Sequence, residues 1–319
     1  MLVFSMVFLY LFFCYYLFRR GLGWTRSCIS FFGSHWFRIP ASSLFWFLAT
    51  TPITAFLLRN TFLHFPLKAL GNYWLGTFLY LILFLLLADG IRILLAVTRL
   101  VPRQRLQSRR LRAATGGVLL TLVLALSVYG SLHAGHLYHT EYAVAIPKDG
   151  GQNTQLTVAL AADLHLGYNT SIRHIQELVD QINAMEPDLV CLAGDIFDND
   201  YDAIPEPQRL AALLGSIRST YGVYACYGNH DLDEPILMGF TFDGKQEQTD
   251  TRLLEFLDTA NIRLLEDESV LIDNSFYLAG RKDYSRVRKT EDAARLTPAQ
   301  LTQGLDAEKP LLVLDHQPR

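Results

Sequence analysis

Three short apolar runs in the second half of the chain each end in side chains that commonly bind metal ions. An Asp-Leu-His sequence ends at His165, a Gly-Asp pair ends at Asp195, and an Asn-His-Asp sequence ends at Asp231. Carboxylate, imidazole and amide ligands together suit Mn²⁺, Fe or Zn²⁺ better than Mg²⁺ or Ca²⁺. If the three clusters meet in space, they indicate hydrolysis assisted by two metal ions about 3.5–4 Å apart that share one carboxylate.

The apolar runs before these clusters have the pattern of strands, and the segments between them have that of helices. A continuous apolar run is typical of a strand that is buried on both faces of a sheet. Sites in open α/β sheets lie beyond the carboxyl ends of the strands, so we expect the three clusters to converge. The predicted strands are Leu156–Ala162, Asp188–Ala193 and Gly222–Tyr227, and the predicted helices are Ile172–Met185 and Pro207–Arg218.

The two halves of the chain differ sharply in composition. Of the 319 residues, those up to about residue 135 are mostly apolar and their charges are nearly all arginine, whereas the remainder is acidic, and the net charge is −3. No basic stripe of a nucleic-acid-binding protein is present, so no nucleic-acid partner is expected. The four cysteines have no regular spacing, which argues against a disulfide scaffold or a zinc knuckle. We therefore assign residues 1–135 to a transmembrane helical anchor and residues 136–319 to an α/β domain.

The first half contains four stretches apolar enough to cross a bilayer, which requires about 20 helical residues. They are Met1–Phe18, Ala41–Leu58, Ala69–Ala88 and Ala113–Leu132. The first stretch lacks the basic start and the small-residue cleavage site of a signal peptide, so a retained helix is favoured. The sequence thus predicts an integral membrane protein of the plasma membrane, with the lipid bilayer as a partner.

The arginine distribution predicts the orientation of these helices. The first and third connecting loops carry four and six arginines, whereas the second carries only Arg59 and Lys68. Because basic loops stay in the cytoplasm, the α/β domain is expected on the extracytoplasmic side. Asp89 and Arg92, near the end of the third stretch, are either an intramembrane site or an interfacial ion pair, and the ion pair is favoured.

The motifs Asp-Leu-His, Gly-Asp-Ile-Phe-Asp and Gly-Asn-His-Asp, in this order and each after a predicted strand, resemble the calcineurin-like metallophosphoesterase superfamily. The sequence is most similar to membrane-anchored bacterial cell-envelope members, over about Leu156 to the C-terminus. The resemblance implies a four-layer α/β/β/α sandwich that binds two divalent ions. It also implies hydrolysis of a phosphomonoester, phosphodiester or pyrophosphate by a hydroxide held between those ions. A phosphorylated small molecule, phospholipid headgroup or lipid-linked sugar phosphate is the expected substrate class.

The resemblance also implies a role for each residue at the strand ends. The first metal would bind Asp163 and His165, Asp195 would bridge the two ions, and the second metal would bind Asn229 and His316. His316 follows another predicted strand, Pro310–Asp315. His230 would protonate the leaving group, and Asp231 would orient that imidazole, as carboxylates commonly do. The polar segment over residues 233–250 is expected to help shape the substrate pocket.

The sequence departs from the family pattern at its end. The Gly-His-x-His motif that closes the family pattern does not occur in the 319 residues, the last of which lies three positions after His316. Each metal would then lack one histidine ligand. We interpret the domain as incomplete at its C-terminus, so the chain as given is expected to be an inactive fragment of an enzyme. The alternatives are a non-catalytic membrane sensor or binding protein, and a transporter with an appended hydrolase.

Overall fold

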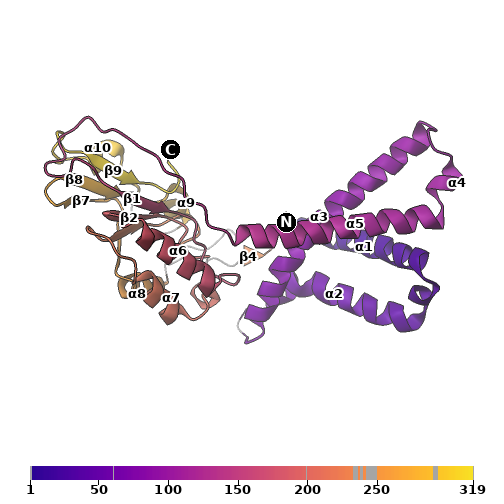
Figure 1. Cartoon of the computed structure of the whole chain (residues 1–319). Helices are drawn as coiled ribbons and strands as arrows, with labels where there is room; N and C mark the ends of the chain where they lie inside the picture. The colour runs from indigo at the N-terminus through magenta and orange to yellow at the C-terminus, as the bar shows by residue number, and fades with distance from the viewer. Residues whose placement is uncertain are drawn as a thin grey trace. The chain divides into compact units, whose positions relative to one another are not determined.

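The computed structural model describes residues 2–59, 61–198, 200–232, 236–237, 240–241, 250–289 and 294–318. The chain divides into two compact units, Met1–His136 and Leu137–Arg319. We call them the helical unit and the α/β unit and describe each by itself (Figure 1).

The helical unit consists of long helices joined by short connections. Its elements are α1 (Leu2–Cys28), the 3₁₀ turn η1 (Ser30–Gly33), α2 (His35–Leu57), α3 (His64–Val97), α4 (Arg103–Leu106) and α5 (Arg109–Ala134). Helix α2 packs on α3, and α5 packs on both α1 and α3. Ser108 caps the start of α5, because its hydroxyl accepts a hydrogen bond from the backbone N–H of Leu111.

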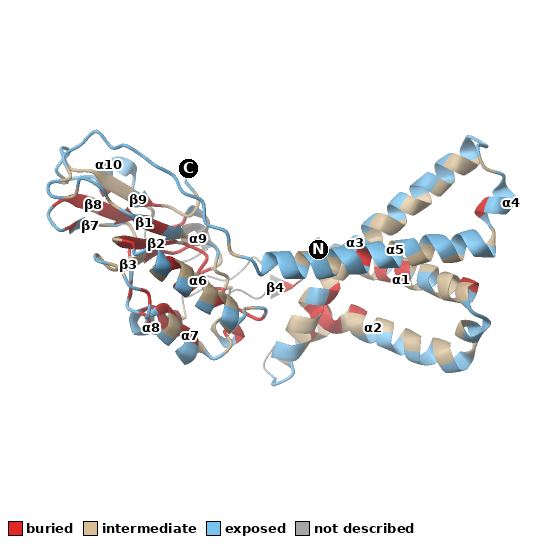
Figure 2. Ribbon diagram, viewed as in Figure 1, coloured by how far each residue is buried: buried red, intermediate tan, exposed pale blue. Residues whose placement is uncertain are grey.

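Three of these helices, α2, α3 and α5, are long and apolar enough to cross a membrane. Helix α3 is the most apolar, with a mean hydropathy of 2.3 over a window in which no residue is buried. Such a helix is suited to lipid, because its backbone is satisfied internally while its side chains face hydrocarbon. Figure 2 shows the same exposure along much of the helical unit. Helix α1 covers the first predicted span but is not among the three, and it carries Arg19, Arg20 and Arg26 in its second half.

The α/β unit alternates strands and helices as the sequence predicts. Its first part comprises β1 (Val158–Ala161), α6 (Ile172–Ala184), β2 (Leu189–Ala193), η2 (Tyr201–Ala203), α7 (Pro207–Leu214), β3 (Val223–Cys226), β4 (Ile236–Leu237) and β5 (Phe240–Thr241). Its second part comprises α8 (Thr251–Thr259), β6 (Ile262–Leu264), β7 (Glu268–Ile272), β8 (Phe276–Gly280), α9 (Tyr284–Lys289), α10 (Pro298–Leu301) and β9 (Leu311–Leu314).

The first sheet is parallel throughout, in the order β1-β2-β3-β6. Helices α6, α7 and α8 cover one of its faces through apolar side chains at helical spacing, such as Ile175, Leu210 and Leu253. These three side chains are almost fully buried. The helix faces and the sheet therefore form one hydrophobic core, which fixes the strand ends where the metal-binding residue types occur.

The second sheet, in the order β7-β8-β9, packs on the opposite face of the first. A second core cluster joins Cys191 and Cys226 of the first sheet to Leu278 and Leu314 of the second. Both cysteines are free and buried. The described residues thus form a layer of helices, a parallel sheet and a second, mixed sheet, and β9 belongs to that second sheet.

One prediction about the sheet is wrong. The first strand was expected to be buried on both faces, but β1 is the edge strand of its sheet, and Leu160 within it is 67% exposed. A continuous apolar run shows that a segment avoids polar residues, whereas the layers that pack on the sheet decide which faces of the strand are covered. The neighbouring strand β2 lies inside the sheet, and four of its five residues are buried.

Candidate metal centre

The carboxyl ends of β1, β2 and β9 bring three metal-binding side chains together. Asp163, Asp195 and His316 each place one ligand atom within 4.8 Å of the other two. Nε2 of His316 lies 3.2 Å from Oδ2 of Asp195. Each residue follows the end of its strand by two positions, so the sheets themselves position the cluster.

Two further imidazoles border this cluster. Nε2 of His165 lies 3.8 Å from Oδ1 of Asp163 and 3.8 Å from Oδ2 of Asp195. The ring of His230 lies edge-on to the ring of His165, with their centroids 5.2 Å apart. The structure therefore brings residues from all the predicted strand-end clusters to one place.

The backbone at three residues of this site adopts a conformation that residues other than glycine usually avoid. Asp163, His165 and Asp195 have φ values of 57°, 42° and 49°, in the left-handed region. Such a conformation costs about 1–3 kcal/mol per residue and persists only where its surroundings hold it. Here the N–H of Asp163 donates to the carbonyl of Gly194, and the N–H of His165 donates to the carbonyl of Asp195. The loops after β1 and β2 thus hold one another in the geometry that gathers the side chains.

Two glycines give the ligands room to approach. A Cβ atom on Gly228 would lie 2.2 Å from Oδ1 of Asp195 and 2.5 Å from its backbone nitrogen. A Cβ atom on Gly194, where φ is +83°, would lie 2.7 Å from the ring of His316. The absence of a side chain at these two glycines thus leaves space for Asp195 and His316.

The hydrogen bonds of Asp195 and His316 engage one polar atom of each side chain and leave the other facing the cluster. Oδ1 of Asp195 accepts the backbone N–H of His230 at 2.8 Å, and its Oδ2 remains beside His165 and His316. Nδ1 of His316 bonds the carbonyl of Ala193 at 2.9 Å, which leaves Nε2 for the cluster. This pattern, in which one ring nitrogen is held by a carbonyl, is common for histidines that bind metals.

The charge at the site favours a cation. Burial lowers the pKa of His316, but the carbonyl of Ala193 and the negative charges of Asp195 and Asp163 outweigh burial, so the pKa is raised overall. The field that favours a proton on this imidazole favours a metal ion for the same reason. Together with His165, these residues supply two carboxylates and two imidazoles, a donor set that fits Mn²⁺, Fe or Zn²⁺.

The family model described as calcineurin-like phosphoesterase matches residues 156–319, just over half of the chain. The chain belongs to the calcineurin-like phosphoesterase family. The matched segment contains every residue of the cluster, and members of this family typically bind metal ions.

The relatives within this metallophosphoesterase family include membrane proteins. The chain is 26% identical over 165 residues to an uncharacterized metallophosphoesterase of Helicobacter pylori, a match that covers 52% of this chain and 39% of that protein. It is 25% identical over 252 residues to a transmembrane protein with a metallophosphoesterase domain of Danio rerio, covering 76% of this chain and 54% of that protein. It is 22% identical over 238 residues to the UDP-2,3-diacylglucosamine pyrophosphatase LpxG of Chlamydia trachomatis, a match that covers 62% of this chain and 70% of that protein. The chain thus spans about two fifths to half the length of the first two relatives.

Asn229, the predicted amide ligand, is held by residues that the sequence did not single out. Its Oδ1 accepts a hydrogen bond of 2.6 Å from Nε2 of Gln317. Oε1 of Gln317 in turn accepts a bond of 3.0 Å from the hydroxyl of Ser285. The one signal for Gln317 in the sequence is its place directly after His316, and nothing local marks Ser285.

Asp231 contacts the backbone of two loops at the site. It is fully buried, and its two oxygens accept the backbone N–H groups of Phe197 and Gly228 at 2.8 and 2.6 Å. Burial raises the pKa of Asp231 to about 7, although these two hydrogen bonds act in the opposite direction. These contacts tie the loop after β2 to the loop after β3. That Asp231 orients His230 stays a prediction.

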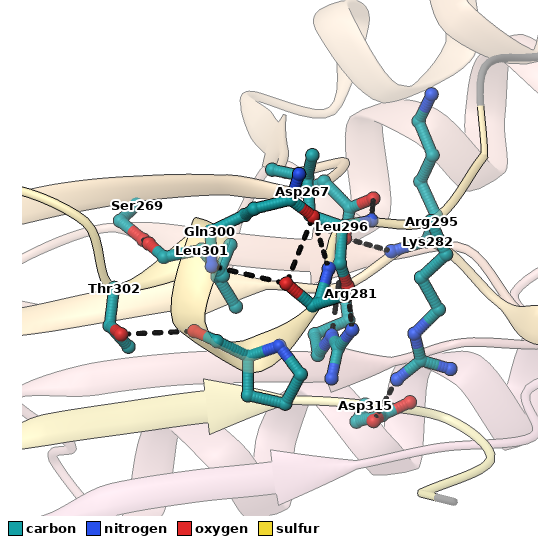
Figure 3. Close-up of polar contacts among 12 residues, drawn as sticks. Asp267, Ser269, Arg281, Lys282, Arg295, Leu296, Gln300, Leu301, Thr302 and Asp315 are labelled. Carbon is teal, nitrogen blue, oxygen red and sulfur yellow. Dashed lines mark hydrogen bonds and ion pairs between the residues drawn. The ribbon is translucent and has the colours of Figure 1, made fainter.

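A second polar cluster supports the strand that delivers His316 (Figure 3). Asp315 forms an ion pair with Arg295, and both side chains are nearly buried. Asp267 accepts the backbone N–H of Leu296 at 2.8 Å, and Arg281 donates to the carbonyl of the same residue. Asp315 thus has an arginine partner, whereas the carboxylates of Asp163 and Asp195 lie beside the imidazoles of His165 and His316.

The segment expected to shape the substrate pocket, residues 233–250, falls mostly outside the described residues. Its described parts include β4 and β5, which pair with each other in antiparallel fashion.

Proposed function

We propose that this protein is a metal-dependent phosphoesterase with two divalent ions at the ends of β1, β2, β3 and β9. The approach of Asp163, Asp195 and His316 within 4.8 Å of one another carries the proposal. Asp163 and His165 would hold one ion, and Asp195 would bridge to the other, which Asn229 and His316 would hold. We further propose that the α/β unit is a four-layer sandwich, with α10 in the layer beyond the second sheet.

Two bound ions would activate a water molecule and neutralise the charge that develops on the phosphate. The remaining chemistry belongs to the side chains of this chain. His230 stands beside His165 and is partly exposed, so its ring can deliver a proton to the leaving oxygen of a phosphoester. The bond from its backbone N–H to Asp195 keeps this imidazole next to the metal-binding carboxylate.

The substrate that we propose is a phosphomonoester, phosphodiester or pyrophosphate, with a phosphorylated lipid or lipid-linked compound favoured. The relative LpxG is named as a pyrophosphatase of an acylated nucleotide sugar. Three helices of membrane length in this chain support a site that works near a bilayer. From the arginine-rich loops we propose that α1 is a fourth span and that the α/β unit lies on the extracytoplasmic side.

The test is to express the protein from its complete gene, purify it in detergent and measure the turnover of bis(p-nitrophenyl) phosphate with and without Mn²⁺. His230→Ala is expected to lower turnover about 10²–10⁴-fold, the range for loss of a general acid, while Mn²⁺ content stays unchanged. His174→Ala, on helix α6 and outside the cluster, is the matched control and should keep full activity. Equal turnover by the His230→Ala variant would exclude His230 as the acid. Mn²⁺ binding without any turnover by the unmodified protein, expressed from its complete gene, would overturn the enzyme and support the sensor or binding protein.

A further inference from the structure

Asp89 has a different partner from the one its spacing suggests. The sequence favoured an ion pair with Arg92, three residues further along the same helix. In the structure the carboxylate of Asp89 instead accepts hydrogen bonds from the hydroxyl of Tyr16 and from the guanidinium of Arg20, both on α1. Asp89 therefore links α3 to α1, and among the described residues its ion pair is with Arg20 and not with Arg92.

A cavity of about 890 Å³ opens beside this contact, within the helical unit. Residues of α1, α2, α3, α4 and α5 line it, and the volume lies in the upper part of the range for small-molecule sites, about 300–1,000 Å³. Four of the lining residues are arginines, and Asp89 is the one acidic residue among them. The arginines are Arg19, Arg20, Arg92 and Arg112.

The charge around the cavity is strongly positive. Of the four arginines, Arg20 alone has a carboxylate partner within the part of the chain that the structure describes. Arg19, Arg92 and Arg112 therefore place three positive charges on the lining without a matching negative charge. In surroundings of low dielectric such an excess is costly, and an anion bound between the arginines would relieve it.

The rest of the lining is apolar. Phe45, Leu85 and Val123, from three different helices, are among the leucine, phenylalanine and valine side chains that form most of the wall. A free inorganic anion would make no use of this surface. The ligand that fits both parts has an acidic head and a hydrocarbon body, and this unit contains three helices long and apolar enough to cross a membrane of such compounds.

The cavity lies at the end of the helical unit that carries the two arginine-rich connections. Its lining includes the second half of α1 and the first residues of α5, and Nε of Arg109 bonds the carbonyl of Ser27 at 2.9 Å to hold these segments together. Basic pockets between membrane helices are where phospholipid headgroups bind on the cytoplasmic side. We propose that this cavity binds a membrane phospholipid with an acidic headgroup, its phosphate facing Arg19, Arg92 and Arg112. The proposal does not depend on the phosphoesterase activity.

The experiment is native mass spectrometry of the full chain in detergent with added phosphatidylglycerol or phosphatidylcholine. The unmodified chain is expected to retain phosphatidylglycerol in preference to phosphatidylcholine. The double variant Arg92→Gln/Arg112→Gln is expected to lose that preference about tenfold or more, because each arginine near a lipid surface contributes substantially to binding. Inorganic phosphate at millimolar concentration should not displace the lipid, since it lacks the hydrocarbon body.

The matched control is Arg99→Gln/Arg110→Gln, which removes the same charge near Arg92 and Arg112 in the sequence, from residues that do not line the cavity. This variant should keep the preference for phosphatidylglycerol. An equal loss in both double variants would show a general surface attraction and would overturn the site. Displacement of the lipid by inorganic phosphate would overturn the lipid as its ligand. If the double variant does not fold by circular dichroism, Arg19→Gln alone makes the same test with a smaller expected loss.

Discussion

The two units of this protein each gather charged side chains around a buried or partly buried carboxylate, but the two clusters differ in sign. In the α/β unit, Asp195 stands beside a second carboxylate and two imidazoles, so the cluster attracts a cation. In the helical unit, Asp89 is outnumbered by arginines, so that cluster attracts an anion. The sign of the expected ligand thus follows from the charges that remain without a partner, and a carboxylate alone does not decide it.

The clusters also differ in how the chain assembles them. The proposed ligands of the α/β unit follow their strands by two to four residues, so the sheets bring short sequence motifs together. The helical cluster takes residues from the middle or ends of helices that are far apart in the sequence, and no motif announces it. Arg20 and Asp89, for example, are 69 positions apart.

The largest effect is expected from removing the charge of Asp195, the carboxylate that we propose bridges the two ions. Asp195→Asn keeps the size of the side chain, and its amide oxygen can still accept the N–H of His230. Its amide group would then face His165 and His316 in place of an anionic oxygen. Mutation of a residue that only supports a metal ligand typically lowers metal affinity about 10–100-fold. Loss of Asp195, a proposed direct ligand, should therefore lower Mn²⁺ affinity at least about a hundredfold. Isothermal titration with Mn²⁺ measures the affinity directly.

Asp258→Asn is the control for this prediction, because it removes an equal charge from an exposed position on α8. It should leave Mn²⁺ affinity unchanged. Mn²⁺ at a hundred times its dissociation constant should also raise the stability of the unmodified chain by about 2.7 kcal/mol and leave that of Asp195→Asn nearly unchanged. Equal Mn²⁺ affinity in the two variants would remove Asp195 from the metal centre.

The sequence predicted the α/β unit well wherever the signal is local. The strands ending before Asp163, Asp195 and His316 were found because each is a short apolar run followed by a ligand, and their positions follow from the parallel sheet. The exposure of β1 was not predictable, because the layers that cover a sheet depend on contacts that a single run does not encode. Three of the four predicted spans lie in helices long and apolar enough to cross a membrane, and length and hydropathy are local properties too.

What the sequence missed lies in contacts between distant residues. Gln317 holds Asn229 across 88 positions, and nothing in either local pattern indicates the bond. The resemblance implies a role for Asp231 beside His230, but nothing in the local pattern indicates that its carboxylate also contacts the backbone of Phe197 in another loop.

A smaller effect is expected from Asp231→Ala. This change removes a carboxylate that supports the loops after β2 and β3 but is not one of the proposed metal ligands. The backbone N–H groups of Phe197 and Gly228 would lose their acceptor in a buried place. Each unsatisfied group costs about 1–3 kcal/mol, so we expect a loss of about 2 kcal/mol or more in the free energy of unfolding. Thermal or urea unfolding of the full chain, followed by circular dichroism, measures it. Unchanged stability would mean that the carboxylate does not hold the two loops together.

The smallest effect is expected from changes at two adjacent glycines of α5. These changes test the wall of the cavity that we propose binds a phospholipid. A Cβ atom on Gly116 would lie 2.0 Å from the ring of Trp24, whereas a Cβ atom on Gly117 would meet nothing within 4 Å. Gly117→Ala should therefore stabilise the helix, by up to about 1 kcal/mol, because alanine is the better helix former. Gly116→Ala carries the same gain but must displace Trp24, which donates a hydrogen bond to the carbonyl of Ala113 and lines the cavity. Overpacking of this kind costs about 1–3 kcal/mol, so the net result should be a lower melting temperature and a shifted tryptophan emission. If the two variants melt alike and emit alike, Trp24 does not pack against Gly116, and the cavity lacks that wall.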